Sequence, residues 1–338
     1  VKSDDDDVIA YHDVERLRQD IKKVVTAPGE QIIHVIPQEY TIDNERGIVD
    51  PIGHSGIRLE GNFHIITARV SSARNIIRCV NRADLNVESL VLEPIASSEA
   101  VLVDDEKEAG VALVDIGGGT TDIAIFKDGI IRHTAVLPLG GNTITNDIKS
   151  GCSVMKKQAE AMKIKFGSAL ANEAKANEII TIPGLKGREP KEISVRNLAH
   201  IIQARTEEIF EHVLFEIKSS GYEKDLIAGI VVTGGGSQLK HLTQLVEYVT
   251  GIDARIGLPN EHLSRAMVDD VKSPMYATGI GLLMHGYKQI ETSNRPMADH
   301  KNEEDTESQE KPNKGWFKDI ITKGKSWLNE DVDDFQNS

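Results

Sequence analysis

The sequence predicts an α/β protein in which short buried strands alternate with amphipathic helices. Two patterns support this prediction. Apolar residues recur at helical spacing in several segments, and short apolar runs bounded by glycine or proline are typical of buried strands. The chain has 338 residues, of which 39% are hydrophobic. That is enough for more than one domain with its own core.

Composition excludes several classes of protein. A net charge of −14 disfavours a nucleic-acid partner, because phosphate binding requires clustered cations. Cys79 and Cys152 are the two cysteines and form no CxxC pair, which favours a reducing, cytoplasmic environment. No apolar run is long enough to span a membrane. The acidic tract Asp4–Asp7 suits a solvated loop, and we expect further residues upstream of Val1.

The first part of the chain is expected to form a small α/β module. Its apolar residues switch between helical and strand spacing, with Pro and Gly at the breaks. The expected elements are a helix capped by Asp13 and ended by Pro28-Gly29, a strand Gln31–Ile36 halted by Pro37, a strand Asn62–Val70, and a helix capped by Ser72. A short strand, Val87–Leu92, and a helix of small residues, Ile95–Val103, follow.

Residues 111–136 are predicted to form an antiparallel meander. The apolar runs Val111–Val114 and Ile123–Phe126 flank a glycine turn, and Asp128-Gly129 is a strong hairpin signal. Rossmann and Walker loops instead pass from a strand into a helix. The order of elements therefore excludes these two common nucleotide folds at this position.

The turn of this meander predicts a phosphate and metal loop. Gly117, Gly118 and Gly119 let backbone N–H groups point at an anion. Thr120 and Thr121 add hydroxyl donors, while Asp115 or Asp122 would hold Mg²⁺ through water. The alternative is a plain glycine-rich hairpin, but two acids and two hydroxyls around the glycines favour the binding loop.

Further candidate residues follow the meander. Gly140 and Gly141 open a helix, and in the next helix Glu160 and Lys163 share one face, where a simple salt bridge is the alternative. Residues 179–191 are expected to be rich in loops, and Ser194 caps a long helix reaching about Ser220. A buried strand, Gly229–Thr233, leads into Gly234, Gly235 and Gly236, which open a helix whose N-terminus suits a sugar or phosphate, or else form a packing turn. A second small-residue helix, Pro274–Gly286, could cross the first at a hinge.

The tail is predicted to bind membranes. Residues 291–313 are polar and acidic, as in a disordered linker. Residues 314–329 then form a two-faced helix, typical of interfacial binding to anionic lipid; docking on the protein or a partner is the alternative. Its apolar face holds Trp316, Phe317, Ile320, Ile321, Trp327 and Leu328, and the lysines are Lys318, Lys323 and Lys325.

These features together resemble a known family. Asp115–Asp122, Val231–Ser237 and the two small-residue helices resemble the actin, sugar-kinase and chaperone ATPase superfamily. Within it, three stretches resemble the FtsA family of bacterial cell-division proteins, over about residues 8–285: Ile33–Tyr40, Asp50–Gly53 and Leu92–Pro94.

The resemblance implies a two-lobed, actin-like (ribonuclease H-like) fold that encloses ATP and Mg²⁺. It implies that Glu160 and Lys163 contact the adenosine, that Gly234–Gly236 contact adenosine and phosphates, and that Gly140-Gly141 lie near the ribose. A first Asp-x-Gly-Thr phosphate hairpin is also implied, and none precedes Asp115. The implied domains are 1–88, an inserted 1C-type domain of the first lobe; 89–110, a connecting strand and helix; 111–151 with 229–290, the nucleotide-binding core of the second lobe; 152–228, a second-lobe subdomain; 291–313, the linker; and 314–329, the membrane helix.

The expected function is that of an ATP-binding scaffold at the cytoplasmic side of the inner membrane, at the division site. The resemblance implies self-assembly into filaments, binding of the C-terminal tail of FtsZ through about Gly151–Ala228, and recruitment of later division proteins through the 1C domain. No catalytic residue is expected, and hydrolysis of ATP would be weak or absent. The alternatives are a related pilus-assembly adaptor and a phosphotransferase or ATPase of the same superfamily.

Overall fold

The computed structural model describes residues 8–175, 177–183, 189–259 and 269–294. The chain divides into two compact units, Val1–Thr292 and Ser293–Ser338. Nearly all of the second unit lies outside the described residues, and with it the predicted helix 314–329 and all of its membrane-facing residues. Within the described ranges, no helix combines the length and apolarity needed to cross a bilayer.

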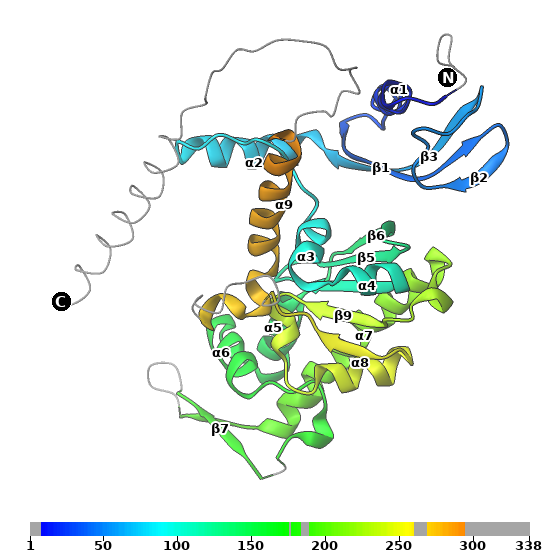
Figure 1. The fold of residues 1–338 in the computed structure, drawn as a ribbon. Helices are drawn as coiled ribbons and strands as arrows, with labels where there is room; N and C mark the ends of the chain where they lie inside the picture. Colours follow the sequence, from blue (N-terminus) through cyan, green and yellow to red (C-terminus); the bar gives the residue numbers. More distant parts are fainter. Residues whose placement is uncertain (1–7, 176, 184–188, 260–268, 295–338) are drawn as a thin grey trace. The chain divides into compact units, whose positions relative to one another are not determined.

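The N-terminal module is a three-stranded antiparallel sheet with two helices (Figure 1). The strand order is β2-β1-β3, and a small core of Ile9, Val14, Tyr40, Ile42 and Leu59 packs against it. Its elements are α1 (Tyr11–Ile21), β1 (Glu30–Ile42), β2 (Glu45–Ile48), β3 (Leu59–Arg69) and α2 (Val70–Arg82).

Four expectations for this module are wrong. Helix α1 ends at Ile21, well before Pro28-Gly29, and α2 begins at Val70, so Ser72 lies inside the helix and does not cap it. Asp13 is not the N-cap of α1: the helix begins at Tyr11, and the Asp13 carboxylate accepts the Ala10 N–H at 3.0 Å. Pro37 does not end β1. Pro37 lies opposite Phe63 of β3, beside an irregularity in the pairing between Pro37 and Glu39, and a bulge is a place where a strand tolerates proline.

The predicted strand at residues 87–92 is also absent. These residues are irregular, and the Leu92 N–H donates to Nε2 of His34 at 3.0 Å instead of to a strand. Helix α3 (Glu93–Val101) then begins with Pro94 in its first turn, where proline is tolerated. It is followed by α4 (Asp104–Ala109).

A five-stranded sheet forms the centre of the molecule, in the order β10-β9-β4-β5-β6. Strands β4, β5 and β6 pair antiparallel, which confirms the predicted meander, and β9 runs parallel to both β4 and β10. The strands are β4 (Val111–Ile116), β5 (Thr121–Lys127), β6 (Ile130–Leu137), β9 (Ile230–Thr233) and β10 (Ala254–Ile256).

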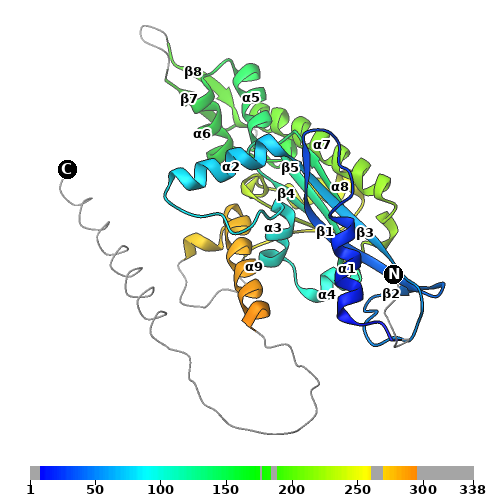
Figure 2. The ribbon, with the colours of Figure 1, turned by 90° about the horizontal axis from the view of Figure 1, so that it is seen from above.

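Helices cover both faces of this sheet (Figures 1 and 2). Val114 and Ile123 belong to a large apolar cluster with α5, α7 and α8, whereas Leu113 and Ala124 face a smaller cluster with α3 and α9. The helices are α5 (Gly141–Cys152), α6 (Lys156–Phe166), α7 (Val195–Ser220), α8 (Leu242–Thr250) and α9 (Ala277–Asn294).

Two later expectations are corrected. The region 179–191 is not simply loop: β7 (Ile179–Ile182) and β8 (Lys191–Ser194) pair as a hairpin. Residues 291–294, predicted to belong to a linker, are the last residues of α9, and the rest of the predicted linker lies outside the described residues. The predicted contact of small-residue helices is confirmed, since a Cβ placed on Gly281 of α9 would lie 1.8 Å from the carbonyl oxygen of Ala96 in α3.

Candidate functional site

The two glycine loops meet at one pocket of about 390 Å³. The first loop joins β4 to β5, and the second follows β9, the neighbour of β4 in the sheet. Residues of helices α5 and α6, together with Leu239, Lys240 and Met275, supply the rest of the wall. The lining includes Gly117, Gly118, Gly141, Asn142, Glu160, Lys163, Gly235, Gly236, Leu239 and Met275.

The first loop is a closed hairpin held against α5. The Gly117 N–H donates to the Thr120 carbonyl at 2.9 Å, and the Gly141 and Asn142 amides donate to Gly117 and Gly118 carbonyls at 2.9 and 2.8 Å. The amides at the start of α5 are therefore already used within the protein. Gly140 and Gly141 therefore hold the first loop in place. Gly141 also lines the pocket, but its N–H is not free to bind a ligand.

The second loop packs against the end of β4. Gly234 has a φ of +82°, and a Cβ placed there would lie 2.3 Å from Oδ1 of Asp115. The loop does not open an α-helix as expected. It forms a short 3₁₀ turn, η3 (Gly235–Gln238), and α8 begins only at Leu242, because His241 has left-handed backbone (φ 60°).

Backbone amides of both loops are available to a ligand. In the described part of the chain, the N–H groups of Gly118, Gly119, Gly235 and Gly236 donate to no protein acceptor. Nothing lies within 4 Å of a Cβ built on Gly119 or Gly235. Unpaired amides around an open space are the arrangement that binds phosphate oxygens, so these loops fit a nucleotide.

Glu160 and Lys163 form a salt bridge of 2.9 Å and also line the pocket. The Lys163 ammonium makes two further bonds, to the Gly141 carbonyl and to Thr145 Oγ1, both at 2.9 Å. Since an ammonium has three hydrogens, Lys163 has no donor left for a ligand. Its polar role is to join α5 to α6.

Glu160 keeps one carboxylate oxygen for a ligand. Its Oε2 takes the bonds from Thr145 and Lys163, and no protein contact to Oε1 is present among the described residues. Burial acts to raise the pKa of Glu160, but the hydrogen bonds from Thr145 and Lys163 outweigh it and lower the pKa. Glu160 is therefore an ionised acceptor at the pocket wall.

Asp115 and Asp122 are direct cross-strand neighbours below the first loop. Both are buried, with 3% and 6% of their surface exposed. Burial raises the pKa of each, although Ser97 and Thr278 hydroxyls bond to Asp115 and oppose the shift there. Burial and the two aspartates likewise raise the pKa of Glu93 at the start of α3.

These three acids fit a hydrated cation. No group of three or more His, Cys, Asp or Glu side chains among the described residues is placed to ligate a metal directly. Carboxylates that repel one another and resist ionisation are nevertheless stabilised by a nearby positive charge. Contact through water is how Mg²⁺ usually meets a nucleotide site.

One of the two predicted threonines does not fit. The Thr121 hydroxyl is fully buried and donates to the Leu139 carbonyl at 2.8 Å, because alternate residues of β5 point to opposite faces. Thr120, which is only partly buried, bonds to Asp122. Of the two predicted threonines, only Thr120 therefore keeps a partly exposed hydroxyl in the first loop.

Several neighbours of the site were not expected from the sequence. Asn142, Glu93, Ser97, Thr278 and Met275 all lie at the pocket or at the buried acids. One feature of the sequence could have pointed to Glu93, because it is an acidic residue at the start of a helix of small residues. Nothing in the sequence pointed to Thr278 as a site residue, because its contact with Asp115 depends on how α9 packs at the end of the sheet.

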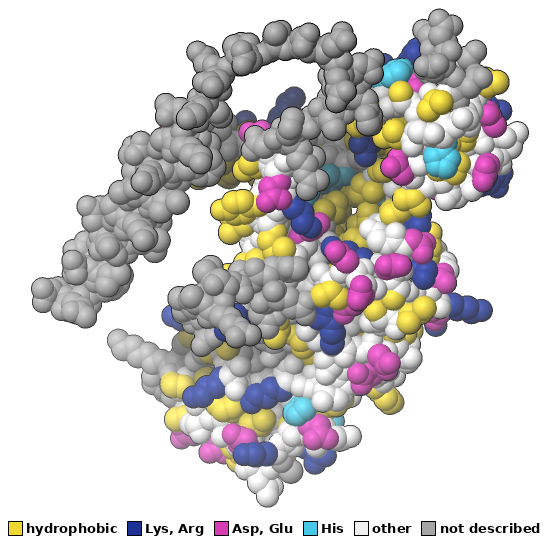
Figure 3. Space-filling view, in the orientation of Figure 1, with side chains coloured by type: hydrophobic (Ala, Val, Ile, Leu, Met, Phe, Trp, Pro, Cys, Tyr) yellow, Lys and Arg dark blue, Asp and Glu magenta, His cyan; other side chains and the backbone are white. Residues whose placement is uncertain are grey.

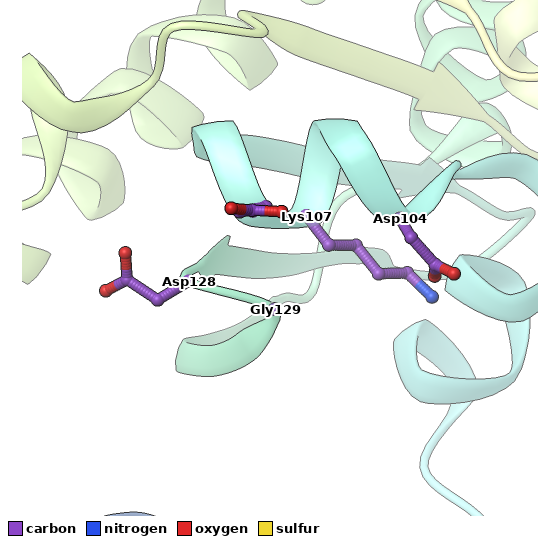
Figure 4. A pocket seen from close by; sticks show the side chains of 5 residues that line it. Asp104, Lys107, Asp128 and Gly129 are labelled. Carbon is purple, nitrogen blue, oxygen red and sulfur yellow. The ribbon is translucent and has the colours of Figure 1, made fainter. Parts of the chain in front are cut away.

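A second hollow of about 300 Å³ lies at the opposite ends of β4 and β5. It is lined by Asp104, Lys107, Glu108, Asp128 and Gly129 (Figure 4). Burial lowers the pKa of Lys107, whose ammonium lies 5.8 Å from the centre of the Phe126 ring. No glycine-rich loop borders this hollow, and none of the predicted site residues contributes to it.

Comparison with known proteins identifies the family. Residues 112–281 match the family model "Cell division protein FtsA", and residues 1–67 match "SHS2 domain inserted in FTSA". This chain belongs to the FtsA family. FtsA of Pseudomonas aeruginosa is 43% identical over 277 residues, which cover 82% of this chain and 66% of that protein. FtsA of Neisseria meningitidis is 39% identical over 279 residues, covering 82% and 67%.

The chain thus spans about two thirds of the length of these FtsA relatives. Among solved structures, the PilM-PilN type IV pilus biogenesis complex has a TM-score of 0.55 at 17% identity, covering 81% of this chain and 72% of the other. MreB5 of Spiroplasma citri bound to ADP has a TM-score of 0.53 at 16% identity, covering 80% and 92%. The predicted fold class, actin-like α/β with an inserted domain, is confirmed.

Proposed function

We propose that this FtsA-family chain is part of an ATP-binding scaffold of cell division that assembles on the inner face of the cytoplasmic membrane. The observation that supports this most is the pocket between two glycine loops, with four unpaired amides. The ADP complex of MreB5, a protein of like fold, supports a nucleotide there as well.

In this proposal the amides of Gly118, Gly119, Gly235 and Gly236 hold the phosphates, and Glu160 accepts from the adenosine. Lys163 positions Glu160 and contacts the nucleotide, if at all, through its methylene stem. Asp115, Asp122 and Glu93 hold the waters of Mg²⁺, which offsets phosphate charge. In this proposal ATP acts as a conformational ligand with slow turnover or none.

The first test is nucleotide affinity. Replacing Glu160 by Ala removes a charged acceptor, and the loss of one such hydrogen bond weakens binding by about 10-fold or more. Titration calorimetry with ATP and Mg²⁺ measures this, and Lys157→Ala, an exposed change on the same helix, is the control. Equal affinity of the two variants would contradict the assignment of Glu160.

The second part of the proposal concerns assembly. We infer filament formation, binding of the FtsZ C-terminal tail through about residues 151–228, and recruitment of later division proteins through residues 1–88. The proposed division of the chain also includes a connecting segment (89–110), a nucleotide-binding core (111–151 with 229–290), a linker (291–313) and a membrane helix (314–329). Family membership supports a role in the division machinery.

The tail is the proposed membrane anchor. Trp316, Phe317 and Ile320 are among its apolar residues, with Lys318 among the lysines opposite. Ending the chain at Lys314 should release most of the protein from vesicles that contain anionic lipid, as measured by co-sedimentation. Sedimentation unchanged by this deletion would rule out the anchor.

A further inference from the structure

Helix α2 carries a row of arginines on one face. Arg74, Arg78 and Arg82 follow one another at intervals of four residues, which places them along the same side of the helix. All three are exposed, and Ala73 is the single buried residue of α2. Most of the surface of α2 is therefore exposed and accessible to a partner.

The row has no internal partners. No ion pair or hydrogen bond joins these guanidinium groups to another described residue, and the sequence has no acid between Glu60 and Asp84. On the face of the protein that Figure 3 shows, basic and acidic side chains are interspersed. A concentrated cationic face in a chain of net charge −14 is therefore a specific feature.

The hollow along this face has one wall. It measures about 400 Å³ and is lined by Arg74, Ile77, Arg78, Asn81 and Arg82, all of which belong to α2. Guanidinium groups bind phosphate oxygens in a bidentate manner. A peptide is usually gripped between two walls or beside a strand edge, whereas a single projecting helix face can approach a flat surface.

We propose that the arginine face of α2 binds the anionic phospholipid surface, as a second contact beside the tail. The proposal rests on the membrane association inferred above. A single short anchor gives reversible binding, and a basic patch is a usual second signal. The charge of the face and its lack of an opposing wall both favour phosphate headgroups over an acidic peptide.

The test compares charge reversal at two places. Arg74→Glu, Arg78→Glu and Arg82→Glu are combined in one variant, and Arg46→Glu, Lys149→Glu and Lys224→Glu in a control with the same change of net charge; the control residues are exposed. Vesicles contain phosphatidylcholine alone or with an equal part of phosphatidylglycerol. We expect the first variant to lose about tenfold or more in affinity for the anionic vesicles, beyond the loss in the control.

Further arms separate this proposal from the anchor. The chain ending at Lys314 should keep weak, salt-sensitive binding to anionic vesicles, which the α2 variant of that shortened chain loses. If only the tail deletion reduces binding, the anchor holds and the α2 proposal fails. Replacing the arginines by lysines should retain most binding. The α2 proposal would be overturned if the control variant lost as much affinity for anionic vesicles as the α2 variant. It would also be overturned if the protein bound polyglutamate as tightly as it binds those vesicles.

Discussion

Glycine serves two different purposes at the pocket. A Cβ on Gly140 would lie 2.8, 2.9 and 3.0 Å from the carbonyl oxygens of Gly117, Thr120 and Gly118. At Gly119 and Gly235 the same atom would meet nothing within 4 Å. The first kind of glycine lets two backbone segments approach, and the second leaves room for a ligand.

This difference predicts unequal effects of alanine. Gly140→Ala must push the first loop away from α5, and such overpacking lowers the free energy of unfolding by about 1–3 kcal/mol. Gly119→Ala should change it by less than about 0.5 kcal/mol. Urea denaturation of both variants measures the difference. Equal stability would show that the loop moves away from Gly140 without strain.

The sequence predicts contacts within one helix better than contacts between helices. Spacing alone placed Glu160 and Lys163 on one helical face, and the structure has them paired there. It could not place Thr145, which lies on another helix and donates to Glu160. That contact depends on how α5 and α6 pack, and helical periodicity carries no information about packing between helices.

At the scale of elements, helices α3 and α9 meet at Gly281 and Ala96. A Cβ atom on Gly281 would lie 1.8 Å from the backbone oxygen of Ala96. Rotating a side chain cannot relieve this clash, because the atom in the way belongs to the backbone. Ser97 of α3 and Thr278 of α9 both bond to Asp115 from this contact. The helix pair therefore also orients a buried acid of the site.

Two glycines of α9 give a matched prediction. Gly281→Ala should separate the helices and lower the free energy of unfolding by about 3 kcal/mol or more. Gly279→Ala has open space at its Cβ and should raise it by up to about 1 kcal/mol, the difference in helix propensity. Thermal unfolding followed by circular dichroism distinguishes the two. A similar shift for both variants would mean that the helices do not meet at Gly281.

Elements of the central sheet were predictable, and those at the margins were not. β4 and β5 are almost wholly buried, so hydrophobic runs and turn residues identified them. β1 continues past Pro37, and β7 with β8 forms a hairpin within a stretch rich in Gly and Pro. β1 is held by its pairing with β3, and β7 by its pairing with β8, and local composition does not report such pairing.

At the scale of the whole molecule, five hydrogen bonds between described residues connect the inserted sheet to the rest of the first unit. Gln38 donates to the Ile131 carbonyl at 2.8 Å, and Arg132 donates to the Gln38 carbonyl at 3.2 Å. His64 bonds to Thr134 at 3.1 Å, and His34 accepts the Leu92 N–H. Arg132 also donates to Oε1 of Gln38 at 3.5 Å. Histidines thus supply two of the five.

The folded protein lowers the pKa of both histidines. Burial lowers the pKa of His34, and nearby His285 lowers it further; burial and His133 do the same for His64. The unfolded chain, with histidine pKa values near 6.5, therefore binds protons before the folded chain does as pH falls. Stability from these groups is present above about pH 6.5 and is lost as pH falls below it.

The free energy of unfolding should therefore decrease between about pH 7.5 and about pH 5.5. In a variant with His34→Gln and His64→Gln the decrease should be smaller, whatever the stability at pH 7.5, because neither glutamine titrates. Urea denaturation across this range measures the slope. His200→Gln with His212→Gln, two exposed positions on α7, is the control and should leave the slope unchanged. If the His34 and His64 variant retains the full slope, protonation at the inserted sheet does not govern the acid sensitivity of the fold.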